Sequence, residues 1–460
     1  MTDINKIQTD SRKVVAGDTF IALKGIKSDG HDYILKAIEN GAIKIIASIK
    51  QQIDFKNIEY VDDTSNYLNK ILLNEYTPLF SKMKFIGVTG TNGKTTSCYL
   101  IYQMLNKLKS KTAYIGTIGF YNGDKVIELD NTTPDILELY KLIYMAYQNN
   151  CQNVVMEVSS HALDQNRING IKFDVAGFTN LTQDHLDYHL TFENYLNAKV
   201  KIINYLASNG LIVVNIDDSY SKNFLGEKSI TFGMNDSDFK IENHHEVDAQ
   251  SIINFNNKGK KYEVQTNLLG TFNVYNYLTA LIIVNSLGYL IDDILTITKD
   301  IFPPKGRVDI VKVNSGIAII DYAHTPDAVE KIIKTFNNQP NREVITVIGC
   351  GGNRDATKRP IMGKIATELS DRVIFTSDNP RLEDPQQIIE DILKGVLKQN
   401  YVVVINRREA IINALQMMKP GGVVLILGKG HEPYQDVGNI KNHFDDKEEV
   451  INYIKANLTD

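Results

Sequence analysis

The feature that most constrains the fold is a glycine-rich turn between an apolar run and a helical pattern. Residues 84–96 read Lys-Phe-Ile-Gly-Val-Thr-Gly-Thr-Asn-Gly-Lys-Thr-Thr. In such a turn, backbone N–H groups surround phosphate oxygens at the positive end of the helix dipole. We expect Lys94 to reach the β- and γ-phosphates of a nucleoside triphosphate and the Thr95 hydroxyl to hold Mg²⁺. The remaining residues of this predicted phosphate loop are Gly90, Thr91, Asn92, Gly93 and Thr96.

The spacing of this loop departs from the common pattern, because Val88 stands five residues before Gly93, where a glycine is usual. Gly87 and Gly90 flank that position. An ordinary glycine-rich turn between a strand and a helix is the alternative. We favour the phosphate loop, because Gly-Lys-Thr-Thr after an apolar strand is uncommon by chance and apolar residues recur at helical spacing after it.

Length and composition narrow the class of protein. A chain of 460 residues is too long for one core, so two to four domains are expected. A formal net charge of −5 argues against a nucleic-acid binder. We see neither a secretory signal nor an apolar stretch of membrane-spanning length, and we therefore expect a cytoplasmic protein. The scattered Cys98, Cys151 and Cys350 fit reduced thiols better than a metal site or a disulfide.

Short apolar runs alternate with amphipathic helical patterns along the chain, which predicts α/β domains with mainly parallel sheets. Breaks before the phosphate-loop strand and at Pro303-Pro304-Lys305-Gly306 divide the chain. We expect an N-terminal domain at 1–83, a central P-loop domain at 84–306 and a C-terminal Rossmann-like domain at 307–460. The polar, Asn-rich stretch 235–261 is predicted to be peripheral, and we assign it no role.

Polar residues after the next predicted strand supply metal-ligand candidates. Glu157 ends an apolar run and is placed to hold Mg²⁺, although a water-facing or helix-capping carboxylate is an equal alternative. The segment 182–189 contains Asp184 and His185, for which a solvated polar loop is the competing interpretation. Lys199 follows on a helical pattern, where a lysine is nearly always solvated. Further along, Asn276 and Asn273 share a helix face and could read an adenine edge, or Asn273 could cap the helix.

Four predicted strands of the C-terminal region are each followed by glycine and charged residues. These loops contain Asp321, Arg354, the run Asp378-Asn379-Pro380-Arg381, and Gly428 with Glu432. The carboxyl ends of parallel strands meet at one edge of a sheet, so we expect the loops to form a ligand cleft. Arg suits a carboxylate and Glu an ammonium group, which favours a zwitterionic substrate over four unrelated turns.

Together these motifs resemble the Mur ligases of peptidoglycan synthesis over nearly the whole chain. The loop 90–96 is shared with the wider family, which includes folylpolyglutamate synthases. Asn131-Thr-Thr-Pro134, residues 157–163 and His185-Leu-Asp-Tyr-His189 are similar to the members that extend UDP-N-acetylmuramoyl-L-alanyl-D-glutamate. Asp378-Asn-Pro-Arg381 resembles the motif of those that select meso-diaminopimelate, since lysine-adding relatives usually lack this arginine.

The resemblance implies a role for each matching residue. Lys94, His185 and Lys199 would be catalytic, with Lys199 carbamylated, and Thr95, Glu157, His185 and Lys199 would hold two Mg²⁺ ions. ATP would also contact Asn276, Arg307 and Asp321. Ser11 would bind the uridine nucleotide. The muramoyl dipeptide would contact Asn131, Thr132, Thr133, Ser159, Gln165 and Arg167, and the amino acid would contact Arg354, Asp378, Asn379, Arg381, Gly428 and Glu432.

The implied reaction is an ATP-dependent amide ligation through an acyl phosphate, carried out by a monomer without nucleic acid or a membrane span. A lysine-adding ligase and a folylpolyglutamate synthase are the alternatives within the class, and Arg381 argues against both by resemblance. A P-loop ATPase that couples hydrolysis to motion or to partner binding is the alternative from another class.

Overall fold

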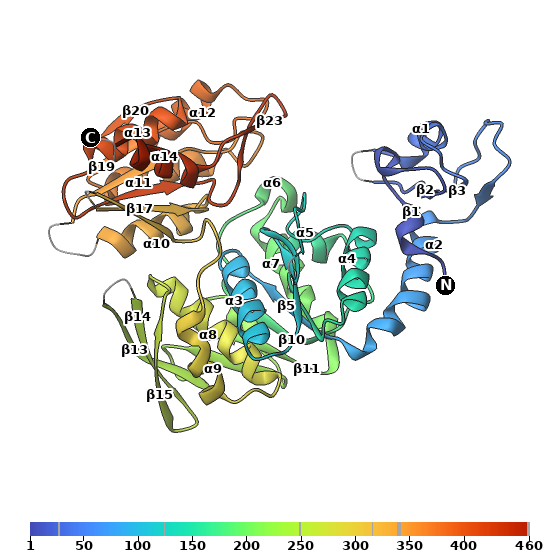
Figure 1. Ribbon diagram of the computed structural model, residues 1–460, viewed down its shortest axis with the longest axis horizontal. Helices are drawn as coiled ribbons and strands as arrows, with labels where there is room; N and C mark the ends of the chain where they lie inside the picture. The colour runs from blue at the N-terminus through green and yellow to red at the C-terminus, as the bar shows by residue number, and fades with distance from the viewer. Residues whose placement is uncertain (26–27, 124, 248–249, 315, 338–341, 458–460) are drawn as a thin grey trace.

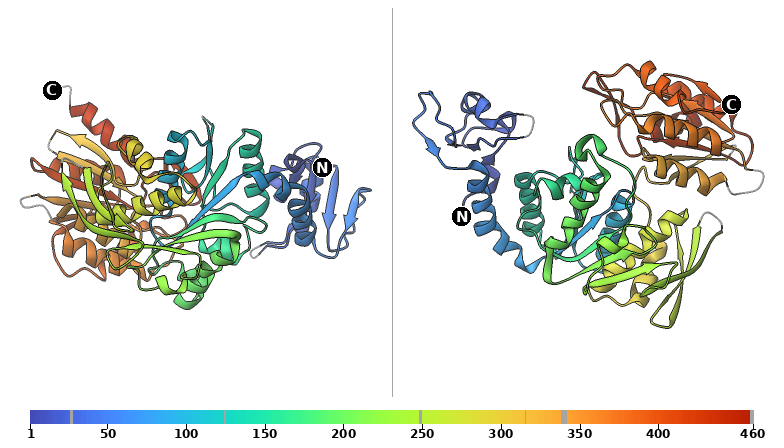
Figure 2. Two further views of the ribbon diagram at one scale, coloured as in Figure 1. Left: turned by 90° about the horizontal axis from the view of Figure 1, so that it is seen from below. Right: turned by 180° about the vertical axis from the view of Figure 1, so that it is seen from behind.

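The computed structural model describes residues 1–25, 28–123, 125–247, 250–314, 316–337 and 342–457. It has an α/β fold with three lobes, each built on its own sheet (Figure 1). The N-terminal and C-terminal lobes lie on different sides of the middle one, and the view from behind in Figure 2 agrees. The predicted fold class is therefore confirmed, whereas the exact domain boundaries at 83 and 306 stay a prediction.

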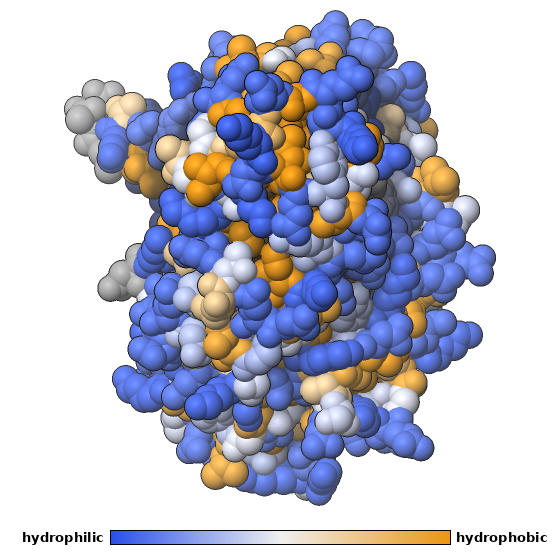
Figure 3. Space-filling model, turned by 90° about the vertical axis from the view of Figure 1, so that its right-hand side faces the viewer, coloured by the Kyte–Doolittle hydropathy of each residue, from blue (hydrophilic) through white to orange (hydrophobic). Residues whose placement is uncertain are grey.

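The N-terminal domain is a four-stranded parallel sheet in the order β1-β2-β3-β4. Its elements are β1 (Ile7–Gln8), β2 (Thr19–Ile21), α1 (Ile34–Glu39), β3 (Lys44–Ala47), β4 (Ile58–Tyr60) and α2 (Thr64–Ile71). Hydrophilic residues cover most of the side of the molecule shown in Figure 3, with smaller apolar areas between them. In this domain Val15, Leu35 and Ile43 are among the exposed apolar side chains.

The middle domain contains an eleven-stranded sheet in the order β15-β14-β13-β12-β11-β10-β5-β9-β6-β7-β8. Its strands are β5 (Lys84–Thr89), β6 (Thr112–Gly116), β7 (Gly119–Asn122), β8 (Lys125–Ile127), β9 (Asn153–Glu157), β10 (Phe173–Phe178), β11 (Leu206–Asn215), β12 (Ser229–Gly233), β13 (Phe239–Val247), β14 (Gln250–Asn257) and β15 (Lys260–Thr266). Its helices are α3 (Lys94–Lys107), α4 (Ile136–Gln148), α5 (Ser160–Asp164), α6 (Leu186–His189), α7 (Phe192–Val200), α8 (Thr271–Ser286) and α9 (Ile291–Ile297).

The pairing of strands in the middle sheet determines where the predicted site residues lie. The strands from β12 to β6 in the sheet order are parallel, and β5 lies between β9 and β10. Segments that follow the carboxyl ends of these three strands therefore meet at one edge. The Asn-rich stretch forms β13 and β14, which pair antiparallel at the far edge, while its residues 248–249 lie outside the described part of the chain. Helix α8 is mostly apolar and is buried along most of its length between the sheet and α3.

The C-terminal domain has a six-stranded sheet in the order β16-β17-β21-β18-β19-β20, in which only the β16–β17 pairing is antiparallel. Its strands are β16 (Asp309–Val313), β17 (Gly316–Asp321), β18 (Val344–Ile348), β19 (Arg372–Phe375), β20 (Tyr401–Val403) and β21 (Gly422–Leu427), with a hairpin of β22 (Tyr434–Val437) and β23 (Ile440–His443). Its helices are α10 (Pro326–Asn337), α11 (Lys358–Leu369), α12 (Pro385–Leu393), α13 (Arg407–Met417) and α14 (Asp446–Asn457).

Two apolar clusters cover the two faces of the C-terminal sheet, one beneath α10 to α12 and one beneath α13 and α14. Leu269 and Phe272 of the middle domain pack into the first cluster. Among the described residues, no helix combines the length and the apolar character that crossing a bilayer requires. Cys98, Cys151 and Cys350 are buried free thiols, as predicted.

Candidate active site between the middle and C-terminal domains

The predicted phosphate loop connects β5 to α3 at the centre of the middle sheet. Gly93 has a φ of +88° and precedes the first residue of the helix, Lys94. A Cβ atom at Gly93 would lie 2.3 Å from the side-chain oxygen of Asn276, so the turn and its neighbour both require glycine there. Asn276 on α8, which is predicted to contact ATP, therefore lies directly against the phosphate loop.

Lys94 and Lys199 point to the same backbone atom of this loop. Their Nζ atoms donate to the Gly90 carbonyl oxygen at 2.9 and 2.7 Å, and Lys94 also donates to the Thr91 carbonyl. Only 1% of the surface of Lys199 is exposed, so the alternative of a solvated helix lysine is wrong. Burial, assisted by the charge of Lys94, lowers the pKa of Lys199 well below its ordinary value. Burial also lowers the pKa of Lys94.

Glu157 ends β9 beside the phosphate loop and is fully buried. Its carboxylate accepts hydrogen bonds from the Thr95 hydroxyl at 2.9 Å, the Tyr114 hydroxyl at 2.6 Å and the Thr117 backbone N–H at 2.8 Å. A water-facing or helix-capping role is therefore wrong. Carboxylate and hydroxyl oxygens are the ligands that Mg²⁺ prefers, so the pair of Glu157 and Thr95 fits that ion.

His185 lies immediately before α6. Its backbone has a φ of +55°, and its Nε2 is 3.4 Å from the carboxylate of the buried Asp184. Desolvation, opposed by the charge of Asp184, lowers the pKa of His185 below its ordinary value, which favours the neutral imidazole that can bind a metal. In the described part of the chain, however, no three His, Cys, Asp or Glu side chains are grouped as metal ligands. A second ion bound by Glu157 and His185 stays a prediction.

The residues predicted to hold the muramoyl dipeptide form one hydrogen-bonded group beside Glu157. The Thr133 hydroxyl donates to the Glu157 carbonyl and accepts from the Ser159 N–H. Arg167 donates to the Thr133 carbonyl at 2.9 Å and to the Gln165 side chain at 2.6 Å. Thr132 lies 3.0 Å from Thr117, whose backbone binds Glu157, and Asn131 beside it is exposed.

Two polar contacts connect the phosphate loop to the C-terminal domain. Arg307 donates to the Thr95 hydroxyl at 3.2 Å, and the Asn92 side chain donates to Asp327 at the start of α10 at 2.8 Å. The carboxylate of Asp321 accepts from the Val308 N–H and thereby fixes the chain next to Arg307. Asn273 donates to the Leu269 carbonyl and caps no helix N–H, so the capping alternative is wrong.

The four glycine-rich loops of the C-terminal domain meet at one edge of its sheet, as strand order requires. Asn379 donates to the Glu432 carboxylate at 2.7 Å, and a Cβ atom at Gly428 would lie 2.3 Å from the Asp378 carboxylate. Arg381 donates to the Gly352 carbonyl at 2.8 Å. A Cβ atom at Gly351 would lie 2.9 Å from an Arg381 guanidinium nitrogen and 3.8 Å from Arg354 Cγ, so both arginines border this loop.

Two further residues contact the side chains predicted to bind the amino acid. Lys429 is fully buried and donates to Asn379 at 3.1 Å. Asp436 on β22 accepts the Arg381 backbone N–H through its carbonyl, and its carboxylate lies 3.9 Å from the Arg381 side chain. Lys429 follows a glycine at a predicted strand end, and this position could have indicated that it lies near the predicted ligand cleft. Asp436 lies in a hairpin whose return to Arg381 no sequence pattern indicates.

Ser11 lies in the N-terminal domain, between β1 and β2, and the N-terminal domain is a separate lobe in Figure 1. It is buried at the start of a short 3-10 turn, Ser11–Lys13, which the Asp10 side chain caps. The turn is tied to the domain by a bond from the Asn40 side chain to the Ser11 carbonyl at 2.8 Å. The predicted uridine site is therefore on a domain separate from the phosphate loop.

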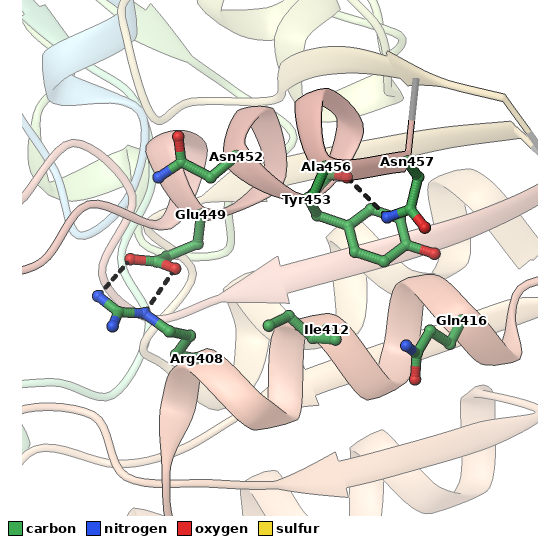
Figure 4. A pocket seen from close by; sticks show the side chains of 8 residues that line it. All are labelled: Arg408, Ile412, Gln416, Glu449, Asn452, Tyr453, Ala456 and Asn457. Carbon is green, nitrogen blue, oxygen red and sulfur yellow. Dashed lines mark hydrogen bonds and ion pairs between the residues drawn. The ribbon is translucent and has the colours of Figure 1, made fainter. Parts of the chain in front are cut away.

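A surface hollow of the C-terminal domain lies outside this constellation, between α13 and α14. Figure 4 shows the Arg408–Glu449 ion pair at one end and Tyr453 at the other. Arg408 Nε lies 2.8 Å from the Glu449 carboxylate. The hollow contains none of the predicted site residues.

Comparison with known proteins identifies the family. Family models match residues 3–77 (Mur ligase family, catalytic domain), 88–284 (Mur ligase middle domain) and 306–430 (Mur ligase, glutamate ligase domain). Proteins named UDP-N-acetylmuramoyl-L-alanyl-D-glutamate--2,6-diaminopimelate ligase are similar. Those of Fusobacterium nucleatum and Clostridium acetobutylicum are 43% and 41% identical, covering 96% and 98% of this chain and 92% and 95% of theirs.

Solved structures agree with this assignment. A structure titled with the same ligase name has 31% identity and a TM-score of 0.66, and the match covers 98% of this chain and 95% of that one. MurF ligase from Thermotoga maritima in complex with ADP has 20% identity and a TM-score of 0.71, with 100% and 99% covered, which supports the fold alone. The chain belongs to the Mur ligase family.

Proposed function

We propose that the protein is an ATP-dependent ligase that joins meso-diaminopimelate to UDP-N-acetylmuramoyl-L-alanyl-D-glutamate. The proposal is supported mainly by the position of two candidate sites on adjoining domains. A phosphate loop and a pocket of Arg381, Asn379 and Glu432 lie on adjoining domains that Arg307 connects through Thr95. The names of the relatives at 41–43% identity support the same reaction.

The chemistry follows from the weakness of a carboxylate as an electrophile. Attack of the D-glutamyl γ-carboxylate on the γ-phosphate of ATP forms an acyl phosphate and releases ADP. The amine of diaminopimelate then attacks the acyl carbon through a tetrahedral intermediate, and phosphate leaves as the amide forms. Lys94 would stabilise negative charge on the phosphoryl group during transfer. Bringing the two domains together would align the reactants and exclude water.

Residues of the middle domain would hold the metal ions and the acceptor. Thr95 and Glu157 would bind one Mg²⁺, and Glu157, His185 and a carbamate on Lys199 would bind a second. When bound, Mg²⁺ supplies positive charge that offsets the phosphate oxygens. The group formed by Thr132, Thr133, Ser159, Gln165 and Arg167, with Asn131 beside it, would position the dipeptide.

The remaining assignments concern the two outer domains and Asn276 on α8 of the middle domain. Ser11 would contact the uridine nucleotide, and Asn276, Arg307 and Asp321 would contact ATP. Arg381 would bind the distal carboxylate of diaminopimelate with parallel hydrogen bonds, while Glu432 would accept its ammonium group. Arg354, Asp378, Asn379 and Gly428 would complete that pocket. We propose that the enzyme acts as a monomer in the cytoplasm.

A phosphate-release assay with the UDP-muramoyl dipeptide and a panel of amino acids tests the function. We expect phosphate release to require both substrates and the product mass to correspond to the tripeptide. Phosphate release without the dipeptide would indicate a P-loop ATPase without ligase activity. Preference for lysine would indicate a lysine-adding ligase. Addition of glutamate to a folate would indicate a folylpolyglutamate synthase. Any of these results would contradict the proposal.

A further inference from the structure

Lys429 is a buried cation in the amino-acid pocket that the proposed reaction does not use. It lies between Gly428 and Gly430 after β21, and none of its side chain is exposed to solvent. Burying an ammonium group is costly unless hydrogen-bond acceptors surround it. The burial of this ammonium group after β21 therefore needs an explanation.

The Lys429 ammonium group has three acceptors in the pocket. Nζ donates to Asn379 Oδ1 at 3.1 Å and to the Tyr434 carbonyl oxygen, and it lies 3.5 Å from Glu432 Oε2. An ammonium group has three N–H donors, so these contacts account for all of them. Two of the three acceptors are side chains predicted to contact the substrate.

Lys429 also fixes which way the Asn379 amide points. Asn379 Oδ1 accepts from Lys429 and from the Asp436 N–H at 2.9 Å, while Nδ2 donates to Glu432 Oε2 at 2.7 Å. If the amide turned over, its NH₂ group would face two donors and its oxygen would face a carboxylate. The Glu432 carboxylate is therefore held in place by Lys429 directly and through Asn379.

We infer that Lys429 is a positioning residue of the amino-acid pocket, which holds Asn379 and the Glu432 carboxylate in the arrangement that receives the ammonium group of the incoming amino acid. This inference rests on the proposed function. A purely structural lysine would affect the folded fraction of the enzyme. A positioning lysine affects the affinity for one substrate out of three, and the two roles can therefore be separated by kinetics.

The central variant is Lys429→Met, which keeps most of the apolar length of the side chain and removes its charge. We expect the KM for meso-diaminopimelate to rise roughly ten- to a hundredfold, as expected when a charge-assisted contact is lost. The KM values for ATP and for the UDP-muramoyl dipeptide should stay within about twofold of wild type, because none of the three hydrogen-bond partners of Lys429 is predicted to contact either substrate. Lys429→Arg, which keeps the positive charge, should recover part of the loss.

Lys441→Met is the matched control. Lys441 is exposed on β23, and its Nζ lies 4.5 Å from the centre of the Tyr434 ring, which Lys429 also approaches at 5.5 Å. It therefore shares a neighbour with Lys429, yet no contact to Asn379 or Glu432 is found for it among the described residues. We expect all three KM values of Lys441→Met to equal those of wild type.

The pH dependence of KM provides a readout that a structural role would not change. The charged and titratable groups that face Glu432 are Lys429, Asp378, Arg407, Tyr322 and Tyr434. Burial and the neighbouring Asp378 raise the pKa of Glu432, and Lys429 opposes this shift. Without Lys429 the carboxyl group should lose its charge at higher pH. The ratio of variant to wild-type KM for diaminopimelate should therefore fall as pH rises.

The inference is overturned if Lys429→Met lowers kcat alone, or if it raises all three KM values equally. It is also overturned if the KM ratio does not change with pH. Should Lys429→Met fail to fold, as judged by its thermal unfolding, the same measurements on Lys429→Gln decide, since glutamine keeps a donor without the charge. Wild-type enzyme that makes no product from diaminopimelate would refute the proposed function itself.

Discussion

Lys94 and Lys199 donate to one and the same carbonyl oxygen, that of Gly90, from two different helices. Burial of an ammonium group is costly, and the repulsion between two ammonium groups on one acceptor adds to that cost. The pKa of Lys199 is lowered accordingly, so a larger fraction of its amine is neutral at a given pH. The neutral amine is the form that reacts with CO₂ to give a carbamate, which replaces a repelling cation by an anion.

The first prediction concerns Lys199. Lys199→Ala should nearly abolish ligation, because it removes both the amine and the carbamate it would form. Added bicarbonate or short-chain carboxylates should restore part of the activity by supplying an anion in its place. Lys201→Ala is the control, since Lys201 lies two residues away in an exposed ion pair with Asp164 at 2.8 Å. Full activity of Lys199→Ala would contradict the assignment.

The second prediction separates the two nucleotide sites. Lys94→Ala should abolish phosphate release while changing the affinity for the UDP-muramoyl dipeptide by less than about threefold, because the predicted uridine site near Ser11 is on another domain. Calorimetric titration of wild type and variant measures that affinity, and Lys107→Ala at the exposed end of α3 is the control. If affinity fell as far as activity, the two sites would not be separate.

The strand–turn–helix of the phosphate loop was predictable because glycines, apolar periodicity and Gly-Lys-Thr-Thr all agree locally. The meeting of the four C-terminal loops at one edge was predictable because alternating strands and helices indicate parallel strands, whose carboxyl ends share an edge. The burial of Lys199 and the set of donors that bind the Glu157 carboxylate were not predictable. Both depend on which strands and helices pack side by side. The hairpin that brings Asp436 to Arg381 is likewise a long-range contact with no periodic signal.

The third prediction concerns a buried ion pair next to the loop that contains Gly428, which is predicted to contact the amino acid. Arg407 and Asp446 are both fully buried and paired at 2.8 Å, and Arg407 also donates to the Leu427 carbonyl, directly before Gly428. Arg407→Met leaves Asp446 charged and unpaired, which should destabilise the C-terminal domain by about 3–5 kcal/mol. Urea unfolding monitored in that domain measures the change in free energy.

The neighbouring Arg408–Glu449 pair is the matched control, because the Arg408 side chain is 59% exposed and lies in the same helix. Arg408→Met should cost no more than about 1 kcal/mol. The double variant Arg407→Met with Asp446→Leu should recover most of the loss, since it leaves no unpaired charge. Equal effects of the two single variants would argue against an unpaired buried charge as the cause.

The fourth prediction concerns acid stability. Burial, followed by the charges of His189 and Arg167, lowers the pKa of His161 from 6.5 to about 4. The unfolded chain therefore binds this proton at higher pH than the folded chain does. Stability is unaffected above about pH 7 and falls as pH drops from about 6.5 to 4, by on the order of 2 kcal/mol.

His161→Gln should flatten this part of the stability curve. Thermal unfolding of wild type and variant at a series of pH values between 7 and 4 measures the difference. His443→Gln is the control, because the His443 side chain is 69% exposed. A variant whose stability falls as steeply as that of wild type would show that His161 is not the group responsible.

Specificity for the third substrate is the central claim, and it depends on Arg381. Diaminopimelate differs from lysine by a carboxylate at its far end, which a planar guanidinium binds with two parallel hydrogen bonds. Arg381 is held by the Gly352 carbonyl at 2.8 Å, and its side chain is 22% exposed, so part of the guanidinium faces solvent. Losing such a bond should cost roughly ten- to a hundredfold in kcat/KM.

The most direct test is kcat/KM for meso-diaminopimelate and for lysine in wild type and in Arg381→Ala. We expect wild type to prefer diaminopimelate strongly, and the variant to lose most of that preference with little change in the KM for ATP. A wild-type enzyme that prefers lysine, or a preference that Arg381→Ala leaves unchanged, would contradict the account.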